Sequence, residues 1–336
     1  MNTRILVTGG AGFIGSAYVR TLLGPDGPKD LADGAGAVTV LDSLTYAGSL
    51  ERLRAVHGHP GYTFVRGSVC DADLVDALAA DHGQIVHFAA ESHVDRSIEA
   101  ASDFTRTNVL GTQTLLDAAL RHGVRTFLQV STDEVYGSLS HGAATEESPL
   151  APNSPYAASK AAADLIALAH HRTHGLDVRV TRCSNNFGPH QHPEKLIPRF
   201  LTALLRGESV PVYGDGLQVR DWLHTQDHVR GLELVRTAGR AGEIYNIGGG
   251  TSLTNLELTH RLLALCGANP ARIAHVTDRK GHDRRYAVDH TKISTELGYR
   301  PAADFGAALA ETARWYRGNR AWWQPLLSAP AQGRRP

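Results

Sequence analysis

The chain has 336 residues, enough for one large domain or two around a sizeable hydrophobic core. Its 34 Lys and Arg residues balance its 34 Asp and Glu residues, so no overall charge favours nucleic acid or a membrane surface as a partner. Its cysteines, Cys70, Cys183 and Cys266, are too widely spread for a disulfide framework or a zinc site, and with no apolar leader or membrane-length apolar run the sequence predicts a soluble, cytoplasmic protein.

The first half of the chain alternates predicted strands and helices. Strands are expected at 4–8, 38–41, 63–66, 85–88, 126–130 and 178–181, and helices from the end of the 9–15 glycine turn to Leu23 and at 72–80, 102–122 and 155–174. Residues 24–37, rich in Gly, Pro and Asp, are expected to form a surface loop. Strict alternation of this kind predicts an α/β fold with a Rossmann-type, doubly wound parallel sheet.

Beyond the sixth strand the pattern becomes less regular. Helices are expected at 197–206, 226–237 and 254–266, and short strands at 210–213, 219–223 and 244–247. We therefore predict a Rossmann domain over residues 1–188, with residues 189–327 forming mainly a smaller α+β substrate-binding lobe. A frayed tail is expected over 328–336.

A glycine turn follows the first predicted strand. Gly9, Gly12 and Gly15 open the next helix, where bare backbone can approach a pyrophosphate at the positive helix end. Asp42 closes the second strand, where its carboxylate can bind an adenosine ribose and would repel the extra phosphate of NADP. A glycine turn or an acid alone would fit an ordinary turn, but the combination, with no Arg in residues 43–45, predicts NAD.

Two acids, a tyrosine and a lysine are expected to lie close together at one edge of the sheet. Asp133 and Glu134 follow the strand at 126–130, at the carboxyl end where α/β sheets bind ligands. Tyr156 and Lys160 are four residues apart on one helix, and a nearby ammonium favours a phenolate, so Tyr156 is the candidate base near neutral pH. An Asp-Glu pair can simply cap a turn, but in this position it can supply one proton donor and one acceptor.

Several motifs in combination resemble a known family. They occupy residues 9–15, 42–48, 87–95, 131–137, 156–160, 182–189, 192–198, 213–216, 220–222 and 278–283. Up to Trp323 the chain resembles the dTDP-glucose 4,6-dehydratases, members of the extended short-chain dehydrogenase/reductase group. The glycine turn and the Tyr/Lys pair would also fit related epimerases and reductases, whereas the Thr-Asp-Glu triplet is far narrower.

The resemblance implies a lyase of deoxysugar biosynthesis that acts on dTDP-glucose. Tyr156, helped by Lys160, would take the hydroxyl proton at sugar carbon 4 while a hydride passes to NAD, and Thr132 would hydrogen-bond the oxygen there. Glu134 would remove the proton from carbon 5, and Asp133 would protonate the hydroxyl leaving carbon 6. The hydride would then return to carbon 6.

The resemblance also implies which residues bind the two ligands. Around NAD it places Gly9, Gly12, Phe13, Ile14, Gly15, Asp42, Leu44, Thr45, Ser68, Val69, Ala89, Ala90, Thr107, Tyr156, Lys160 and Asn186. Around the nucleotide sugar it places Ser92, Thr132, Asp133, Glu134, Asn185, Lys195, Leu196, Pro211, Val212, Tyr213, Arg220, Asn255, Arg279 and His282. Ser68 is a departure, since the family usually has an acid there against adenine, and a looser adenine grip is expected.

Other expectations concern assembly and alternatives. The resemblance implies a homodimer through the helices at 102–122 and 155–174, and the 18 histidines are expected to hold no metal. The nucleotide base stays open between thymine, uracil and another, as does the pathway, which could make cell-wall rhamnose or a secreted glycosylated metabolite. The alternative functions are an NAD-dependent nucleotide-sugar 4-epimerase or decarboxylase, and a catalytically silent NAD-binding protein.

Overall fold

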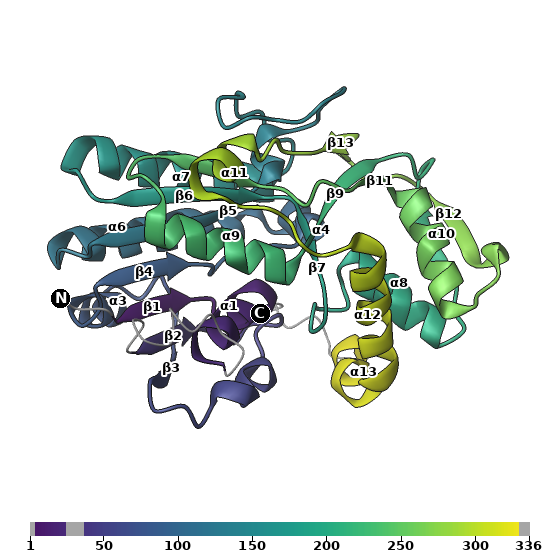
Figure 1. Cartoon of the computed structure of the whole chain (residues 1–336), viewed down its shortest axis with the longest axis horizontal. Helices are drawn as coiled ribbons and strands as arrows, with labels where there is room; N and C mark the ends of the chain where they lie inside the picture. The colour runs from purple at the N-terminus through teal and green to yellow at the C-terminus, as the bar shows by residue number, and fades with distance from the viewer. Residues whose placement is uncertain (1–3, 25–36, 329–336) are drawn as a thin grey trace.

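A seven-stranded parallel sheet forms the centre of the molecule in the computed structural model, which describes residues 4–24 and 37–328 (Figure 1). Its order is β3-β2-β1-β4-β5-β6-β10, so the predicted Rossmann-type sheet is confirmed. The strands are β1 (Ile5–Thr8), β2 (Val38–Asp42), β3 (Tyr62–Arg66), β4 (Gln84–His87), β5 (Thr126–Thr132), β6 (Val178–Cys183) and β10 (Ile244–Ile247). The predicted loop at 24–37 and tail at 328–336 fall almost wholly outside the described residues.

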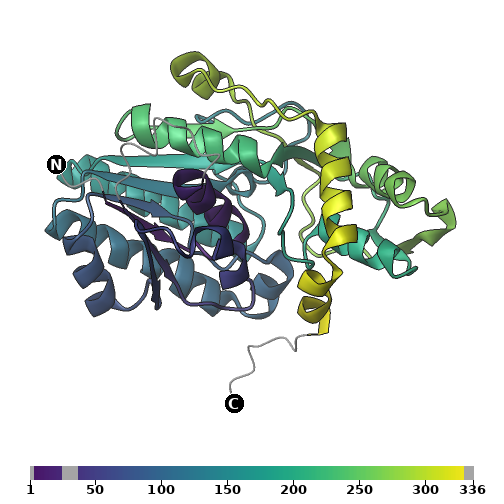
Figure 2. The same cartoon turned by 60° about the horizontal axis from the view of Figure 1, so that its bottom comes forward.

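Helices cover both faces of this sheet (Figures 1 and 2). On one face α1 (Phe13–Leu23) packs against α9 (Thr225–Ala238), which also contacts α11 (Thr291–Leu297). On the other face α6 (Gly111–Arg121) lies between α3 (Ala72–Ala80) and α7 (Pro155–His174). Each face has its own buried apolar core, which explains why the strands read as continuous apolar runs.

The segment predicted as one helix over 102–122 is interrupted. It consists of α5 (Ala101–Phe104), a π-helical stretch η2 (Thr105–Leu110) and α6. Before it come two short helices, η1 (Leu50–Val56) and α4 (Val94–Glu99). π-Helical turns occur often at functional sites, and Thr107 of this stretch was a predicted cofactor contact.

One predicted assignment was wrong. The segments 226–237 and 244–247 were placed in the smaller lobe, yet β10 pairs with β6 as the seventh strand of the main sheet. The helix α9 likewise packs on α1 and β6. The chain thus leaves the sheet after β6 and returns to it, a long-range pairing that no local pattern reveals. Just before the predicted boundary at residue 188, β7 (Asn185–Phe187) pairs with β9 (Val219–His224) rather than with the main sheet, and the rest of the division stays a prediction.

The smaller lobe lies beside the carboxyl ends of the main strands. Its elements are β7 (Asn185–Phe187), α8 (Leu196–Leu205), β8 (Val210–Tyr213), β9 (Val219–His224), β11 (Ser252–Thr254), α10 (Asn255–Cys266), η4 (Pro270–Arg272), β12 (Ile273–Val276), β13 (Arg285–Tyr286), α12 (Phe305–Gly318) and α13 (Arg320–Ser328). β8 pairs with β12, and β9 pairs with β7, β11 and β13. A third apolar core joins α8, α10, α12 and α13.

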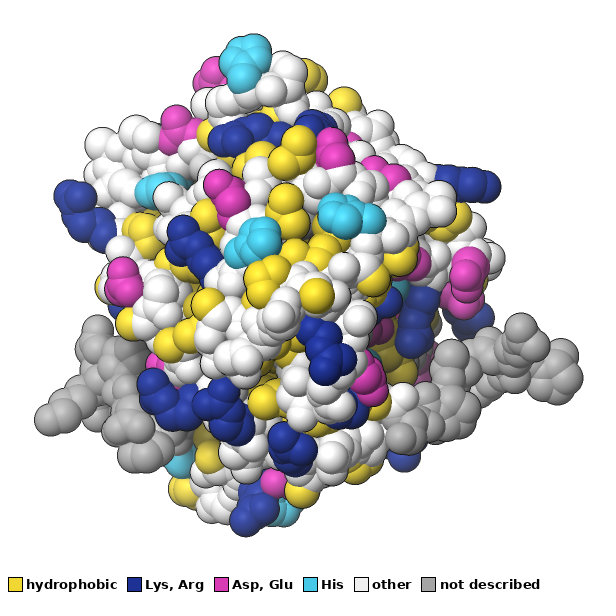
Figure 3. All heavy atoms as spheres, turned by 90° about the vertical axis from the view of Figure 1, so that its right-hand side faces the viewer, with side chains coloured by type: hydrophobic (Ala, Val, Ile, Leu, Met, Phe, Trp, Pro, Cys, Tyr) yellow, Lys and Arg dark blue, Asp and Glu magenta, His cyan; other side chains and the backbone are white. Residues whose placement is uncertain are grey.

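One face of this lobe has a mixed surface. Figure 3 looks onto it and shows basic, acidic and apolar side chains intermingled, in keeping with the balanced composition. Within residues 4–24 and 37–328 no helix is long and apolar enough to cross a membrane, and no cluster of His, Cys, Asp and Glu has a metal-binding arrangement. The three cysteines are free thiols.

Candidate active site

The Thr-Asp-Glu triplet lies where the central strand β5 ends. The strand is buried along its whole length, and the 3-10 helix η3 (Asp133–Tyr136) starts directly after it. Thr132 caps this helix, since its hydroxyl accepts a hydrogen bond from the backbone N–H of Glu134 at 3.3 Å. This cap turns both acids out of the strand at its carboxyl end, the ligand-binding edge of an α/β sheet.

Tyr156 and Lys160 begin the helix α7 beside the triplet. Ser154 caps this helix through the N–H of Ala157, and Pro155 occupies its first turn, so the helix starts just before Tyr156. Both side chains are buried, with 8% and 4% of their surface exposed. The Lys160 ammonium donates to the backbone oxygen of Val130 at 2.7 Å, which ties the helix to β5.

The predicted lowering of the Tyr156 pKa by Lys160 was wrong. Burial raises the pKa of the Tyr156 phenol well above its ordinary value, and Glu134 adds to the rise, while a hydrogen bond with Thr132 opposes it. Lys160 points instead at Val130, and burial lowers the pKa of its ammonium although Asp164 opposes this. Glu134 and Asp133 both act on the phenol in the direction that raises its pKa.

The two acids of the triplet have different surroundings. Asp133 is 3% exposed, and burial, followed by Glu134 and Asp221, raises its pKa well above the usual range. Its Oδ2 atom has no hydrogen-bond partner among the described residues. Such a carboxyl group favours the protonated state and can act as a proton donor.

Glu134 is half-buried and faces positive charge. Burial raises its pKa, but Lys195, Arg220 and Arg279 act in the opposite direction. These cations favour the carboxylate, which can accept a proton. The pKa of both carboxyl groups is raised, that of Asp133 more strongly, and their division into one acid and one base stays a prediction.

The glycine turn fits a dinucleotide. Gly9 has φ +70°, and a Cβ there would lie 2.5 Å from the backbone nitrogen of Ala89; a Cβ at Gly15 would collide with the carbonyl oxygen of Gly9. No side chain caps the first turn of α1 after Gly12, so its N–H groups are left for a pyrophosphate. The residues present therefore suit NAD.

Asp42 anchors the loop after β2. Its Oδ2 accepts from the N–H of Ala11 at 2.9 Å and its Oδ1 from the N–H of Leu44 at 2.8 Å. Each carboxylate oxygen can accept a second hydrogen bond, so a ribose can still bind there. Leu44 has φ +52°, an uncommon conformation for a residue other than glycine, which these contacts hold.

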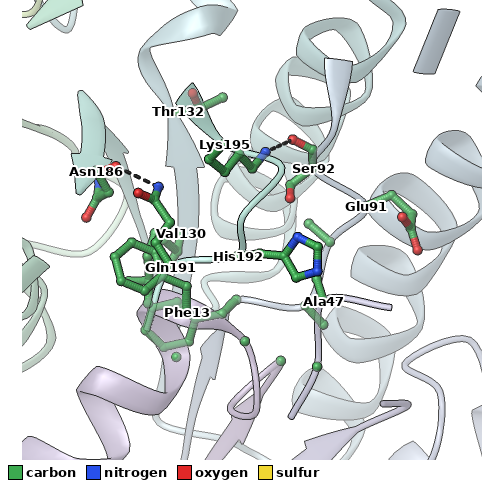
Figure 4. Close-up of a pocket in the computed structure, with 18 of the residues that line it drawn as sticks. Phe13, Ala47, Glu91, Ser92, Val130, Thr132, Asn186, Gln191, His192 and Lys195 are labelled. Atoms are coloured by element: carbon green, nitrogen blue, oxygen red, sulfur yellow. Dashed lines mark hydrogen bonds between the residues drawn. The ribbon is translucent and has the colours of Figure 1, made fainter. Parts of the chain in front are cut away.

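One cavity of about 360 Å³ joins the glycine turn to the triplet and the Tyr/Lys pair. Figure 4 shows Thr132 and Lys195 at one end and Phe13 and Ala47 at the other. Every predicted NAD contact except Leu44 lines it, and of the predicted sugar contacts it includes Ser92, Thr132, Asp133, Glu134, Asn185, Lys195 and Leu196. Lys195 donates to the backbone oxygen of Ser92 at 2.7 Å.

The other predicted sugar contacts do not line this cavity. They are Pro211, Val212, Tyr213, Arg220, Asn255, Arg279 and His282. Three of them lie together in the smaller lobe: the Tyr213 ring is 5.4 Å from the Arg279 guanidinium carbon and 6.1 Å from the His282 ring. Val212 is buried in the lobe core, and Asn255 is the buried first residue of α10.

Ser68 lines the cavity as an exposed residue. Its hydroxyl accepts a hydrogen bond from the N–H of Cys70 at 3.1 Å, which closes a local turn before α3. The hydroxyl proton is still free to donate, but the neutral group cannot supply a carboxylate's charge. The predicted effect on adenine binding stays a prediction.

Several lining residues were not among the predicted contacts. Glu194 accepts from the Tyr46 hydroxyl at 3.1 Å and lies 3.8 Å from both His93 and Arg96. Glu194 directly precedes the predicted sugar contact Lys195, and this was the feature of the sequence that could have indicated it. Cys183, Gln191, His192 and Arg52 also line the cavity, and Arg52 has no signal in its own stretch of sequence.

The chain matches known proteins over nearly all of its length. The family model for GDP-mannose 4,6 dehydratase matches residues 6–312. The dTDP-glucose 4,6-dehydratase of Streptomyces griseus is 64% identical over 329 residues, 98% of either chain, and that of Streptomyces antibioticus is 61% identical over 97% of this chain and 96% of its own.

A solved structure is equally similar. The structure of DesIV (dTDP-glucose 4,6-dehydratase) from Streptomyces venezuelae with NAD and TYD bound superposes with a TM-score of 0.93 at 60% identity. The match covers 96% of this chain and 99% of that one.

Proposed function

The chain belongs to the GDP-mannose 4,6-dehydratase family, and from this premise we propose that it is a dTDP-glucose 4,6-dehydratase. The enzyme is an NAD-dependent hydro-lyase that converts dTDP-glucose to dTDP-4-keto-6-deoxy-glucose for deoxysugar biosynthesis. One observation carries the proposal: a single cavity brings the glycine turn, Tyr156, Lys160 and both acids together. An oxidation alone would not need two acids with opposed surroundings.

The cofactor half of the cavity holds NAD. The glycine turn and the first turn of α1 bind its pyrophosphate, Asp42 binds the adenosine ribose, and Lys160 and Asn186 lie further along the same cavity. When bound, NAD supplies the acceptor for the hydride of carbon 4 and the donor of the hydride that carbon 6 receives.

Tyr156 removes the proton of the carbon 4 hydroxyl. Burial holds the phenol in a water-poor site beside Thr132, whose hydroxyl would hydrogen-bond the oxygen at carbon 4. Lys160 fixes α7 against β5 and supplies a buried positive charge behind the phenol. The resulting ketone at carbon 4 makes the proton on carbon 5 acidic.

The two acids then remove water from carbons 5 and 6. Glu134, whose carboxylate form Lys195, Arg220 and Arg279 favour against the effect of burial, takes the proton from carbon 5. Asp133, protonated because it is buried, gives its proton to the hydroxyl that leaves carbon 6 as water. The hydride returns to carbon 6 and a proton returns to carbon 5, so the cofactor ends in its starting state.

The smaller lobe binds the nucleotide. Tyr213 offers an aromatic face for a base, with Arg279 and His282 beside it. Arg220 and Lys195 both act electrostatically on Glu134. Their positive charges can neutralise the negative charge of a diphosphate, and a diphosphate bound by them would direct the sugar toward the Thr-Asp-Glu triplet.

The experiment that tests the function is incubation of the purified enzyme with dTDP-glucose, UDP-glucose and other nucleotide glucoses, followed by mass spectrometry. We expect a 4-keto-6-deoxy product, lighter than the substrate by one water, with dTDP-glucose preferred. Formation of dTDP-galactose would establish a 4-epimerase instead. Loss of carbon dioxide from a nucleotide uronic acid would establish a decarboxylase, and no turnover of any substrate would leave a silent NAD-binding protein.

We also propose a homodimer in the cytoplasm. Large apolar side chains are exposed on segments that pack on one another: Ile98 on α4, Leu110 on η2 and Leu165 on α7, with 45%, 53% and 55% of their surface exposed. A second copy of the chain would cover them. Sedimentation of the wild-type protein and of Leu165→Glu tests this, and a monomeric wild type would contradict it.

A further inference from the structure

The two C-terminal helices contact the rim of the active-site cavity. The Tyr316 hydroxyl of α12 donates to the backbone oxygen of Gln191, and the rings of Trp315 and Trp322 lie 4.4 and 5.6 Å from the ring of His190. Gln191 lines the cavity and donates to the backbone oxygen of Asn186 at 2.9 Å, as Figure 4 shows. The helices therefore support the loop on the cofactor side of the cavity.

His190 has an unusual backbone conformation in this loop. Its φ is +68°, which a residue other than glycine adopts only when its surroundings hold it there. The two tryptophan rings enclose its side chain, and its carbonyl oxygen accepts a hydrogen bond from Arg52 at 2.9 Å. The contacts that hold this loop thus come from both ends of the chain.

Arg52 connects three segments that surround the cofactor half of the cavity. The same guanidinium that binds His190 also donates to the backbone oxygens of Ala11 at 3.2 Å and Ala47 at 2.5 Å. Ala11 belongs to the glycine turn, and Ala47 to the loop after Asp42. Since Arg52 itself lines the cavity, it lies where these three walls meet.

The surroundings of Arg52 are those of a buried cation. Only 2% of its surface is exposed, and in the part of the chain that the structure describes it forms no ion pair with a carboxylate. Burial lowers its pKa to about 10, so the guanidinium stays charged at neutral pH. The Trp322 ring lies 5.3 Å from its carbon, which puts α13 in direct contact with this junction.

We propose that Arg52 is a positioning residue that joins the glycine turn, the loop after Asp42 and the His190 loop, and that with Trp322 it slows the escape of NAD from the cavity. The inference rests on the proposed function, because that reaction needs the same NAD to stay bound from the first hydride transfer to the second. Arg suits the position because its planar fork can serve several carbonyl oxygens at once.

The test measures how fast excess NAD+ displaces bound NADH, followed by NADH fluorescence in stopped flow. Arg52→Ala is expected to release NADH about tenfold faster or more, the size of one lost charge-assisted hydrogen bond. Arg52→Lys, which keeps the charge but not the fork, is expected to fall between alanine and wild type. Arg54→Ala is the matched control, because that side chain lies in the same short helix but is 81% exposed.

Trp322 provides the second arm, since it does not line the cavity. Trp322→Ala is expected to speed NADH release as well, and the Arg52→Ala/Trp322→Ala pair to be less than multiplicative because both act at one junction. Affinity for dTDP, measured by calorimetry, should not change.

Unchanged NADH release in Arg52→Ala, or multiplicative effects in the pair, would overturn the proposal, even where the melting temperature falls. Release of NADH is measured without substrate, so failure to dehydrate dTDP-glucose would reject the proposed function and leave this result standing.

Discussion

Asp133 and Glu134 are neighbours in the chain whose side chains lie in opposed electrostatic surroundings. Burial, Glu134 and Asp221 raise the pKa of Asp133 well above its usual range and Arg220 is the cation that opposes them, whereas Lys195, Arg220 and Arg279 all oppose the rise at Glu134. This difference between two carboxyl groups of similar intrinsic acidity supports the proposed roles of Asp133 as proton donor and Glu134 as proton acceptor.

Replacing either acid should slow the loss of water more than the oxidation at carbon 4. We expect Asp133→Asn and Glu134→Gln each to reduce dehydration by about 10²- to 10⁴-fold, the usual contribution of one positioned proton-transfer group. Absorbance of reduced nicotinamide follows the oxidation, and mass spectrometry follows the product. Exposed Glu99→Gln serves as the control. If both variants dehydrate at the wild-type rate, the assigned roles are wrong.

The buried Asp133 should make stability depend on pH. Its folded pKa is raised above its unfolded value, so its contribution is fully present below the unfolded pKa and is lost as pH rises toward the folded pKa. Asp133→Asn cannot ionise, so the variant does not lose this stability as pH rises. Its stability relative to wild type should therefore increase from pH 4 upward, by at most about 1.4 kcal/mol per pH unit. Denaturant unfolding at several pH values measures it, and parallel profiles would contradict it.

Tyr156→Phe should abolish the first step of the reaction. The phenylalanine fills the same space but cannot take the hydroxyl proton, so we expect oxidation at carbon 4 to fall by about 10²- to 10⁴-fold. Because the pKa of Tyr156 is raised, wild-type oxidation should become faster as pH increases, and this dependence should disappear in the variant. NADH binding by the variant is the control for an intact cavity.

The ion pair behind the site should be important for stability. Asp164 is fully buried, and its Oδ2 lies 3.0 Å from Nε of Arg182, whose own side chain is 2% exposed. Asp164→Ala leaves the guanidinium buried without its partner, so a loss of about 3–5 kcal/mol in the free energy of unfolding is expected. Glu51→Ala, which breaks an exposed pair with Arg54, should cost at most about 1 kcal/mol. Equal effects of the two variants would argue against this.

Gly9→Ala should damage the cofactor site. A methyl group there would meet the backbone of Ala89, and the φ of +70° disfavours any side chain. We expect a loss of at least about 1 kcal/mol in stability together with weaker NADH binding. Gly58→Ala is the matched control, since nothing lies within 4 Å of the added carbon. If Gly9→Ala binds NADH with the affinity of the wild type, the turn can accommodate the added methyl group and the prediction is wrong.

Much of the site could be predicted because its signals are local. The glycine turn sits between a strand and a helix, the triplet directly follows a strand, and Tyr156 and Lys160 are one helical turn apart. The residues of each motif are only a few positions apart, so local strand and helix formation is enough to bring their side chains together.

Other features depend on contacts between distant segments. Arg52 meets His190 across 138 residues, and β10 rejoins the sheet next to β6 after the chain has built part of the smaller lobe. Neither the sequence around Arg52 nor the sequence of β10 indicates which distant segment it contacts. The tertiary structure was needed to find the residue at the junction and the seventh strand.

Chain order alone determined which groups gather at the carboxyl ends of the strands, because strand ends and helix starts are set by local preferences. Only the tertiary structure decided how those groups ionise. The pKa of Tyr156 is raised where the spacing with Lys160 suggested lowering, since burial and the neighbouring Glu134 outweigh an ammonium that is turned toward Val130. Proton affinity depends on solvent exclusion and on charges brought from far along the chain, and neither is a property of a short stretch of sequence.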